Sequence, residues 1–127
     1  WQRLSLWFGL QEAGFKTTFE RPEPCRSDCH GWGSHPLYHF YASLLGIRPQ
    51  TPGFKSVLVR PLLGSLSWLQ GTLPHPKGKI EVRLKREDSN LQASILLPAG
   101  VPGVFSWEGK SFALAPGRNH LTVESNS

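Results

Sequence analysis

The chain has 127 residues, of which 39% are hydrophobic and 11% aromatic, and this composition excludes a disordered chain. It contains no run of about eighteen apolar residues, so we expect no membrane span and no membrane partner. The formal charge is +5, but the basic residues are thinly spread, and we expect no nucleic-acid partner.

The chain opens on a helical pattern. Apolar residues recur at helical spacing at Leu4, Trp7, Phe8 and Leu10. We predict a helix over residues 1–13 that stops at Gly14, a typical residue just past a helix end. Apolar residues fall on more than one side of it, so we expect it to be packed on two sides and the chain to be a fragment. No signal peptide is visible, and the expected localisation is cytoplasmic or unknown.

A loop separates this helix from a second, amphipathic one. Pro22 and Pro24 exclude a continuous helix between them. Ser34 is a candidate N-cap, and a start near His30 is the alternative. Gly46 is the expected end. The apolar stripe has the i, i+3, i+4, i+7, i+8 spacing of a core-facing helix and comprises Leu37, Phe40, Tyr41, Leu44 and Leu45.

Beyond a connector at residues 48–53, the spacing of the apolar residues changes from the period of a helix to the period of a strand. Short strands separated by Pro, Gly and Asn-rich turns predict an antiparallel β-sandwich. We expect strands near residues 54–60, 66–73, 79–85, 91–97, 104–108, 110–114 and 120–124. Alternate residues on a strand share one face. The predicted inward residues are therefore Val57, Val59, Ile80, Val82, Leu84, Leu91, Ala93 and Ile95.

Most of the chemically versatile side chains lie between residues 17 and 45. Glu20 and Glu23 stand in the proline-stiffened loop, next to Asp28 and His30. Paired carboxylates carry out the chemistry of glycoside hydrolases, and catalytic residues often lie on loops. Taken alone, the composition supports such a site only weakly, because exposed loop glutamates are usually solvated.

Two groups in this stretch resemble parts of metal sites. Cys25, Cys29 and His30 form a C-x3-C-H cluster, but zinc sites usually have a shorter cysteine spacing and a second ligand pair, which the sequence lacks. His35 and His39 are one helical turn apart without a carboxylate at helical spacing. We therefore expect no metal and no cofactor.

A collinear series of motifs runs through nearly the whole chain. It begins with Thr-Thr-Phe-Glu at 17–20, Pro-Glu-Pro at 22–24 and Arg-Ser-Asp-Cys-His-Gly-Trp-Gly-Ser-His-Pro-Leu-Tyr at 26–38. It continues through Leu-Gly-Ile-Arg-Pro at 45–49, Pro-Gly-Phe-Lys at 52–55, Gly-x-Leu-x-Trp at 64–68 and Pro-His-Pro-Lys-Gly at 74–78. In these motifs the chain strongly resembles the bacterial α-L-rhamnosidases of glycoside hydrolase family 78.

The resemblance implies an α+β fold. The last helices of an α/α six-hairpin barrel, at residues 1–47, would precede a C-terminal β-sandwich domain at residues 48–127. It also implies an inverting hydrolase that releases terminal α-L-rhamnose from rhamnose-containing glycosides or polysaccharides. The general acid belongs to the remainder of the barrel, which is the expected partner. We therefore expect the isolated chain to be inactive.

The resemblance also implies site residues. Glu20 matches the family's general base, but its spacing from the preceding threonines is one residue shorter than in the family, so Glu23 is the reserve candidate. His30 and Trp32 match the Cys-His-x-Trp motif that lines the sugar pocket, and His35 is a third expected substrate-binding residue.

Two other functions compete with this interpretation. The first is a non-catalytic carbohydrate-binding β-sandwich module, which an exposed Trp68 or Trp107 on one sheet face would favour. The second is a basic nucleic-acid-binding β-domain, which the lack of interleaved aromatic and basic residues disfavours.

Overall fold

The computed structural model describes residues 5–20, 27 and 29–124. The chain forms two compact units, residues 1–39 and residues 40–127. The predicted domain boundary after residue 47 concerns a longer protein and stays a prediction. No helix within the described residues has the length and apolar character needed to cross a membrane.

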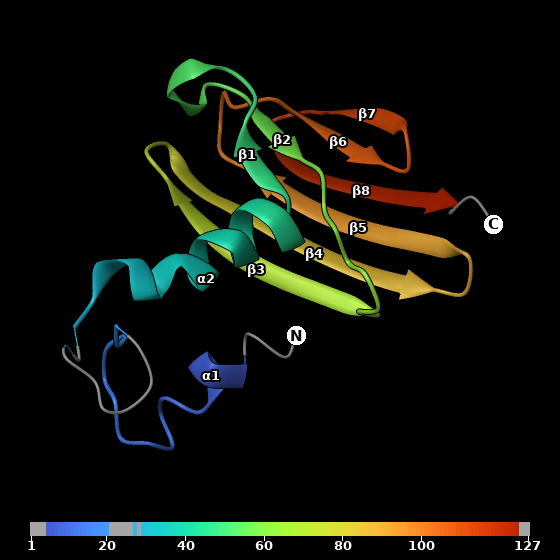
Figure 1. Cartoon of the computed structure of the whole chain (residues 1–127). Helices are drawn as coiled ribbons and strands as arrows, with labels where there is room; N and C mark the ends of the chain where they lie inside the picture. The colour runs from blue at the N-terminus through green and yellow to red at the C-terminus, as the bar shows by residue number, and fades with distance from the viewer. Residues whose placement is uncertain (1–4, 21–26, 28, 125–127) are drawn as a thin grey trace. The chain divides into compact units, whose positions relative to one another are not determined.

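The second unit is a β-sandwich of two four-stranded sheets, with strand orders β1-β2-β6-β7 and β3-β4-β5-β8 (Figure 1). The hairpins turn at residues 76–77, 88–89 and 108–109, where the sequence predicts turns. The strands are β1 (Ile47–Pro49), β2 (Val57–Val59), β3 (Trp68–His75), β4 (Gly78–Glu87), β5 (Asn90–Leu97), β6 (Gly103–Trp107), β7 (Lys110–Leu114) and β8 (Gly117–Glu124).

The facing sides of the two sheets bury one hydrophobic core. All eight predicted inward residues are buried, with at most 3% of any of them exposed. Phe105 of β6 is the largest fully buried side chain. Burying one large aliphatic or aromatic side chain contributes about 1.5–3 kcal/mol, so this core is the main source of stability in the unit.

The prediction of an all-antiparallel sandwich is wrong at one pairing. Strand β2 pairs with β6 in parallel, with Val57 opposite Gly103 and Val59 opposite Phe105. The chain between them forms β3, β4 and β5 of the other sheet. Parallel neighbours need such a crossover, and the side-chain alternation within a strand is the same for either direction. The sequence pattern therefore did not reveal the pairing.

The region around residues 47–59 also differs from the prediction. The expected strand over 54–60 is reduced to β2, and a 3-10 turn, η3 (Pro52–Phe54), precedes it. The expected connector begins with β1, which pairs with β2 so that Ile47 lies opposite Val59. A three-residue edge strand that ends on proline carries almost no local signal.

Within the described residues, the predicted first helix ends earlier than expected. Helix α1 covers Ser5–Phe8, and turns follow up to Gly14, where Phe15 N donates to Leu10 O and Gly14 N to Gln11 O. This is the Schellman arrangement, but it closes the turns that follow α1, whereas the helix itself already ends at Phe8; the predicted helix end at residue 13 is therefore wrong. Most helical stability comes from packing an apolar face, but Phe8 is 69% exposed, and Gly9 disfavours helix.

The second helical region has three parts: a 3-10 turn, η1 (Gly31–Ser34), an α-helix, α2 (His35–His39), and a π-helix, η2 (Phe40–Leu44). The start near His30 is confirmed. The α-helix α2 begins directly after Ser34, the other candidate start, and Ser34 Oγ donates to Gly31 O at 2.6 Å. Leu45 is fully buried and follows η2, whereas Leu37, also in the predicted stripe, is 63% exposed. The remaining stripe residues, Phe40, Tyr41 and Leu44, pack against the core.

Candidate functional site

The predicted site residues that the structure describes lie in the first unit, around a loop whose base is joined by hydrogen bonds. His30 N donates to Thr18 O at 2.8 Å, and Thr18 Oγ1 donates to His30 O at 2.9 Å. Glu20 N donates to Ser27 O at 2.9 Å. These bonds hold Glu20 and His30 on the two paired segments at the base of the loop. The reserve candidate Glu23 lies outside the described residues.

Gly33 lets the turn η1 pack closely on this loop base. A Cβ atom at this position would lie 2.6 Å from Phe19 O and 3.1 Å from Thr18 Cβ, so a larger residue would displace the backbone beside Glu20. From α1, the indole Nε1 of Trp7 donates to Gly33 O. Residues far apart in the sequence thus fix the turn that carries Trp32.

The two residues of the Cys-His-x-Trp motif form an aromatic pair. The ring centroids of His30 and Trp32 are 4.4 Å apart, with 60° between the ring planes. Trp32 is 74% exposed and His30 is half-buried. An exposed indole can stack on the apolar face of a sugar ring, while the imidazole beside it can hydrogen-bond a hydroxyl group.

His35 belongs to the same group. Its Nδ1 lies 2.8 Å from Trp32 O, and because a carbonyl oxygen can only accept, Nδ1 carries the proton. In the neutral ring, Nε2 is then an acceptor for a hydroxyl group. The ring of Trp7 contacts His35 edge-on, with centroids 5.5 Å apart. The structure therefore brings His30, Trp32 and His35 together around η1.

Two scaffold residues of this group, Trp7 and Thr18, were not singled out from the sequence. Trp7 was assigned to the apolar side of a helix, and its contact with Gly33 spans 26 residues, so no local pattern indicates it. Thr18 stands in the Thr-Thr-Phe-Glu motif, which is the signal that could have pointed to it.

The two metal alternatives concern the cysteine cluster and the histidine pair of the first unit. Within the described residues, no group of three His, Cys, Asp or Glu side chains is placed to hold a metal ion. The rings of His35 and His39 have centroids 6.0 Å apart. Cys25 lies outside the described residues, so the expectation of no metal stays an expectation.

The feature expected of a carbohydrate-binding module is present at one of the two tryptophans. Trp68 of β3 is 62% exposed, whereas Trp107 of β6 is only 6% exposed. Arg86 covers Trp107, with its guanidinium carbon 5.8 Å from the ring centroid. The two tryptophans therefore do not form one exposed row.

Comparison with known proteins gives consistent matches. Residues 46–105 match the family described as the bacterial alpha-L-rhamnosidase C-terminal domain. An alpha-L-rhamnosidase from Alteromonas sp. (strain LOR) is 30% identical over 111 residues, and the match covers 78% of this chain and 12% of that protein. The chain thus spans only a small part of this relative.

Solved structures show the same fold at lower identity. The alpha-L-rhamnosidase of Streptomyces avermitilis, determined in complex with L-rhamnose, has a TM-score of 0.74 and 17% identity over 93% of this chain and 15% of that one. The alpha-L-rhamnosidase of Aspergillus terreus has a TM-score of 0.73 and 15% identity over 92% of this chain and 15% of that one. The solved structures show the fold alone, whereas the family match and the Alteromonas relative confirm the resemblance seen in the motifs: the chain matches the C-terminal portion of bacterial α-L-rhamnosidases.

Proposed function

We propose that this chain supplies the general-base side of the active site of an inverting α-L-rhamnosidase. The observation that supports the proposal is the hydrogen-bonded loop base, which holds Glu20 and His30 on paired segments and sets Trp32 beside His30. Residues 1–47 would then be the last helices of the catalytic α/α barrel, and the remainder of the barrel would hold the general acid.

The chemistry requires a fixed carboxylate. In an inverting glycosidase the base activates a water molecule on the face of the sugar opposite the general acid, with the two carboxyl groups about 6.5–9.5 Å apart. Glu20 would accept the proton from this water as the water attacks the anomeric carbon. The backbone bond from Glu20 N to Ser27 O would hold the carboxylate against movement during that step.

The aromatic group would bind the sugar. Trp32 would stack on the apolar face of the rhamnose ring, and His30 and His35 would hydrogen-bond its hydroxyl groups. The natural substrates would be rhamnose-containing glycosides or polysaccharides. The isolated chain should be inactive, because it holds only one of the two carboxylates that the mechanism needs.

The decisive experiment compares Glu20→Gln with Glu23→Gln in the full-length parent enzyme on an aryl α-L-rhamnoside. Glutamine keeps the size of the side chain but cannot accept the proton. We expect Glu20→Gln to lower kcat on the order of 10²–10⁴-fold with little change in KM. Glu12→Gln, at an exposed glutamate of the same unit, is the matched control and should leave kcat unchanged.

The other outcomes are equally informative. If Glu23→Gln loses activity and Glu20→Gln does not, the base is Glu23. If both variants remain active, this loop does not carry the base.

His30→Ala tests substrate binding. It should raise KM, or raise KM and lower kcat, because it removes a binding contact. Proton NMR of the first product tests the stereochemistry: β-L-rhamnose must appear before mutarotation, and initial α-L-rhamnose would rule out inversion.

A further inference from the structure

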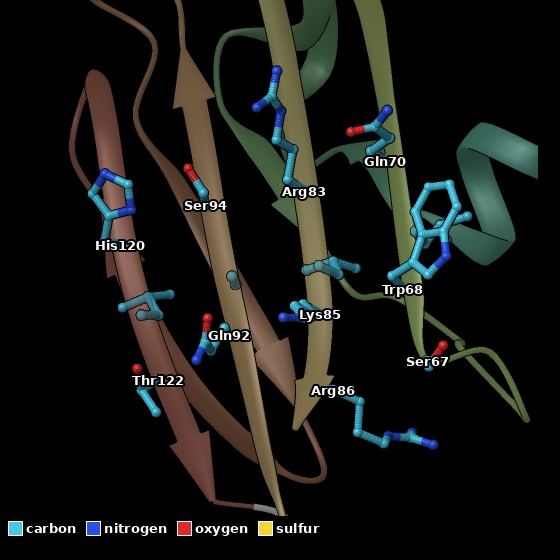
Figure 2. A pocket seen from close by; sticks show the side chains of 14 residues that line it. Ser67, Trp68, Gln70, Arg83, Lys85, Arg86, Gln92, Ser94, His120 and Thr122 are labelled. Atoms are coloured by element: carbon cyan, nitrogen blue, oxygen red, sulfur yellow. The ribbon is translucent and has the colours of Figure 1, made fainter. Parts of the chain in front are cut away.

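The outer face of the β3-β4-β5-β8 sheet carries two rows of mostly polar side chains (Figure 2). The strand register places each row across all four strands. The first row is Gln70, Arg83, Ser94 and His120, and the second is Trp68, Lys85, Gln92 and Thr122. Both rows line a groove of about 500 Å³. The groove lies entirely within the β-sandwich and shares no residue with the site around Glu20.

Some charges on this face already have partners. Lys85 forms an ion pair with Glu87, and Gln92 Nε2 donates to Glu87 Oε2 at 2.6 Å. Beside the first row, Glu81 pairs with Lys79 at 2.6 Å and with Arg118 at 3.8 Å. The hydrogen bond from Lys79 holds the pKa of Glu81 below its usual value. The Glu81 carboxylate therefore stays ionised and paired at neutral pH.

The first row differs from these paired charges, because its polar groups have no partner among the described residues. Within the described part of the chain, the side chains of Gln70, Arg83, Ser94 and His120 make no hydrogen bond or ion pair with another described residue. Arg83 only adds to the positive field around Glu81. A guanidinium group is always charged, and its planar fork matches a carboxylate. This row thus presents a cation, amide and hydroxyl groups and an imidazole toward the groove.

Trp68 stands beside these groups in Figure 2 and offers an exposed apolar ring. A large exposed aromatic next to unpaired hydrogen-bonding groups suits a ligand that is apolar on one face and polar at its edges, as a sugar ring is. Four strands span roughly 14 Å at the spacing of neighbouring strands. The face is therefore wide enough for a short oligosaccharide.

We propose that this face binds an acidic glycan through its uronic acid residues. Trp68 stacks on one sugar ring, Arg83 pairs with a uronate carboxylate, and Gln70, Ser94 and His120 hydrogen-bond the hydroxyl groups. A nucleic acid fits the face less well, because a phosphate backbone is bound through several free cations, whereas Lys85 is already paired with Glu87 and Arg83 is the one cation in the two rows without an ion-pair partner among the described residues. The proposal does not depend on the role of Glu20.

The test is calorimetric titration of the 127-residue chain with tri-galacturonate. The matched probe is the same trisaccharide with its carboxyl groups reduced to alcohols, which keeps the sugar rings and removes the charge. We expect binding of the acidic probe, with affinity for the reduced probe at least about tenfold weaker, because the reduced probe lacks the charge-assisted pair with Arg83.

Variants locate the binding. Trp68→Ala and Arg83→Gln should each weaken binding of the acidic probe tenfold or more, and Arg83→Lys should weaken it less than Arg83→Gln. Lys55→Gln removes an exposed charge outside the groove and should leave affinity unchanged. Each replaced side chain is exposed, so we expect every variant to fold. Circular dichroism checks this.

Several results would overturn the proposal. They are the absence of binding to the acidic probe, equal affinity for the two probes, and equal losses from Arg83→Gln and Lys55→Gln, which would indicate diffuse charge attraction. Tighter, Trp68-dependent binding of single-stranded RNA would assign the face to nucleic acid instead. None of these results bears on the general-base role of Glu20, which is tested separately by kcat.

Discussion

The two units of this chain are stabilised in different ways. Every buried hydrophobic side chain in the described residues belongs to the second unit, from Ala42 to Val123. In the described part of the first unit only Gly33 is buried, and the segments are joined by hydrogen bonds and aromatic contacts such as those of Trp7 and Thr18. The sandwich therefore carries its own core, and the described part of the unit with the candidate catalytic residues does not.

This difference suggests a division of roles. A net hydrogen bond contributes about 0.5–1.5 kcal/mol, so a few of them can fix a loop but cannot replace a core. The exposed apolar side chains of the first unit, among them Phe8, Trp32 and Leu37, fit the proposal that this unit completes a larger barrel. The sandwich is stable through its own core.

The largest expected effect tests the core directly. Phe105 is fully buried, whereas Phe8 is 69% exposed. We expect Phe105→Ala to lower the free energy of unfolding by about 3–5 kcal/mol, because it removes buried apolar area and leaves a cavity. Phe8→Ala should change it by less than about 0.5 kcal/mol. Urea unfolding followed by circular dichroism measures both. Similar losses for the two variants would refute the contrast between the units.

A smaller effect is expected where η2 packs on the inner side of β3. A Cβ atom at Gly71 would lie 2.4 Å from Leu45 Cδ1 and 3.3 Å from Tyr41 Cε1. We expect Gly71→Val to cost about 1–3 kcal/mol in stability through overpacking. Thr72→Val, on the exposed outer side of the same strand, is the matched control. A Gly71→Val variant as stable as Thr72→Val would mean that η2 does not pack on this strand.

The smallest effect concerns the charges of the outer face. The hydrogen bond from Lys79 lowers the pKa of Glu81 in the folded chain, so the pair stabilises the fold above the usual pKa of a glutamate. This contribution should disappear as the pH falls through the lowered pKa. We expect Glu81→Gln to lower Tm slightly at pH 7 and to have no effect at an acidic pH below the lowered pKa. A loss of Tm that is the same at both pH values would show that charge is not the cause.

The candidate site was predictable only as a set of residues. The Thr-Thr-Phe-Glu and Cys-His-Gly-Trp motifs pointed to Glu20, His30 and Trp32 without any structure. How these residues are held was not predictable, because the bonds from Thr18 to His30 and from Trp7 to Gly33 join segments that are distant in sequence. The roles of Glu20, His30, Trp32 and His35 stay predictions until the variants are assayed.

The sequence by itself determined the family resemblance, the alternating core residues of β4 and β5, the hairpin turns and the end of the second helical region just before Gly46. These features depend on local periodicity, on turn chemistry or on contiguous motifs. Tertiary structure alone decided the parallel pairing of β2 with β6 and the early end of the first helix. It also decided which tryptophan is exposed and how Gln70, Arg83, Ser94 and His120 align across four strands. The physical reason is that these features depend on contacts between residues far apart in the chain, which no local pattern of side chains encodes.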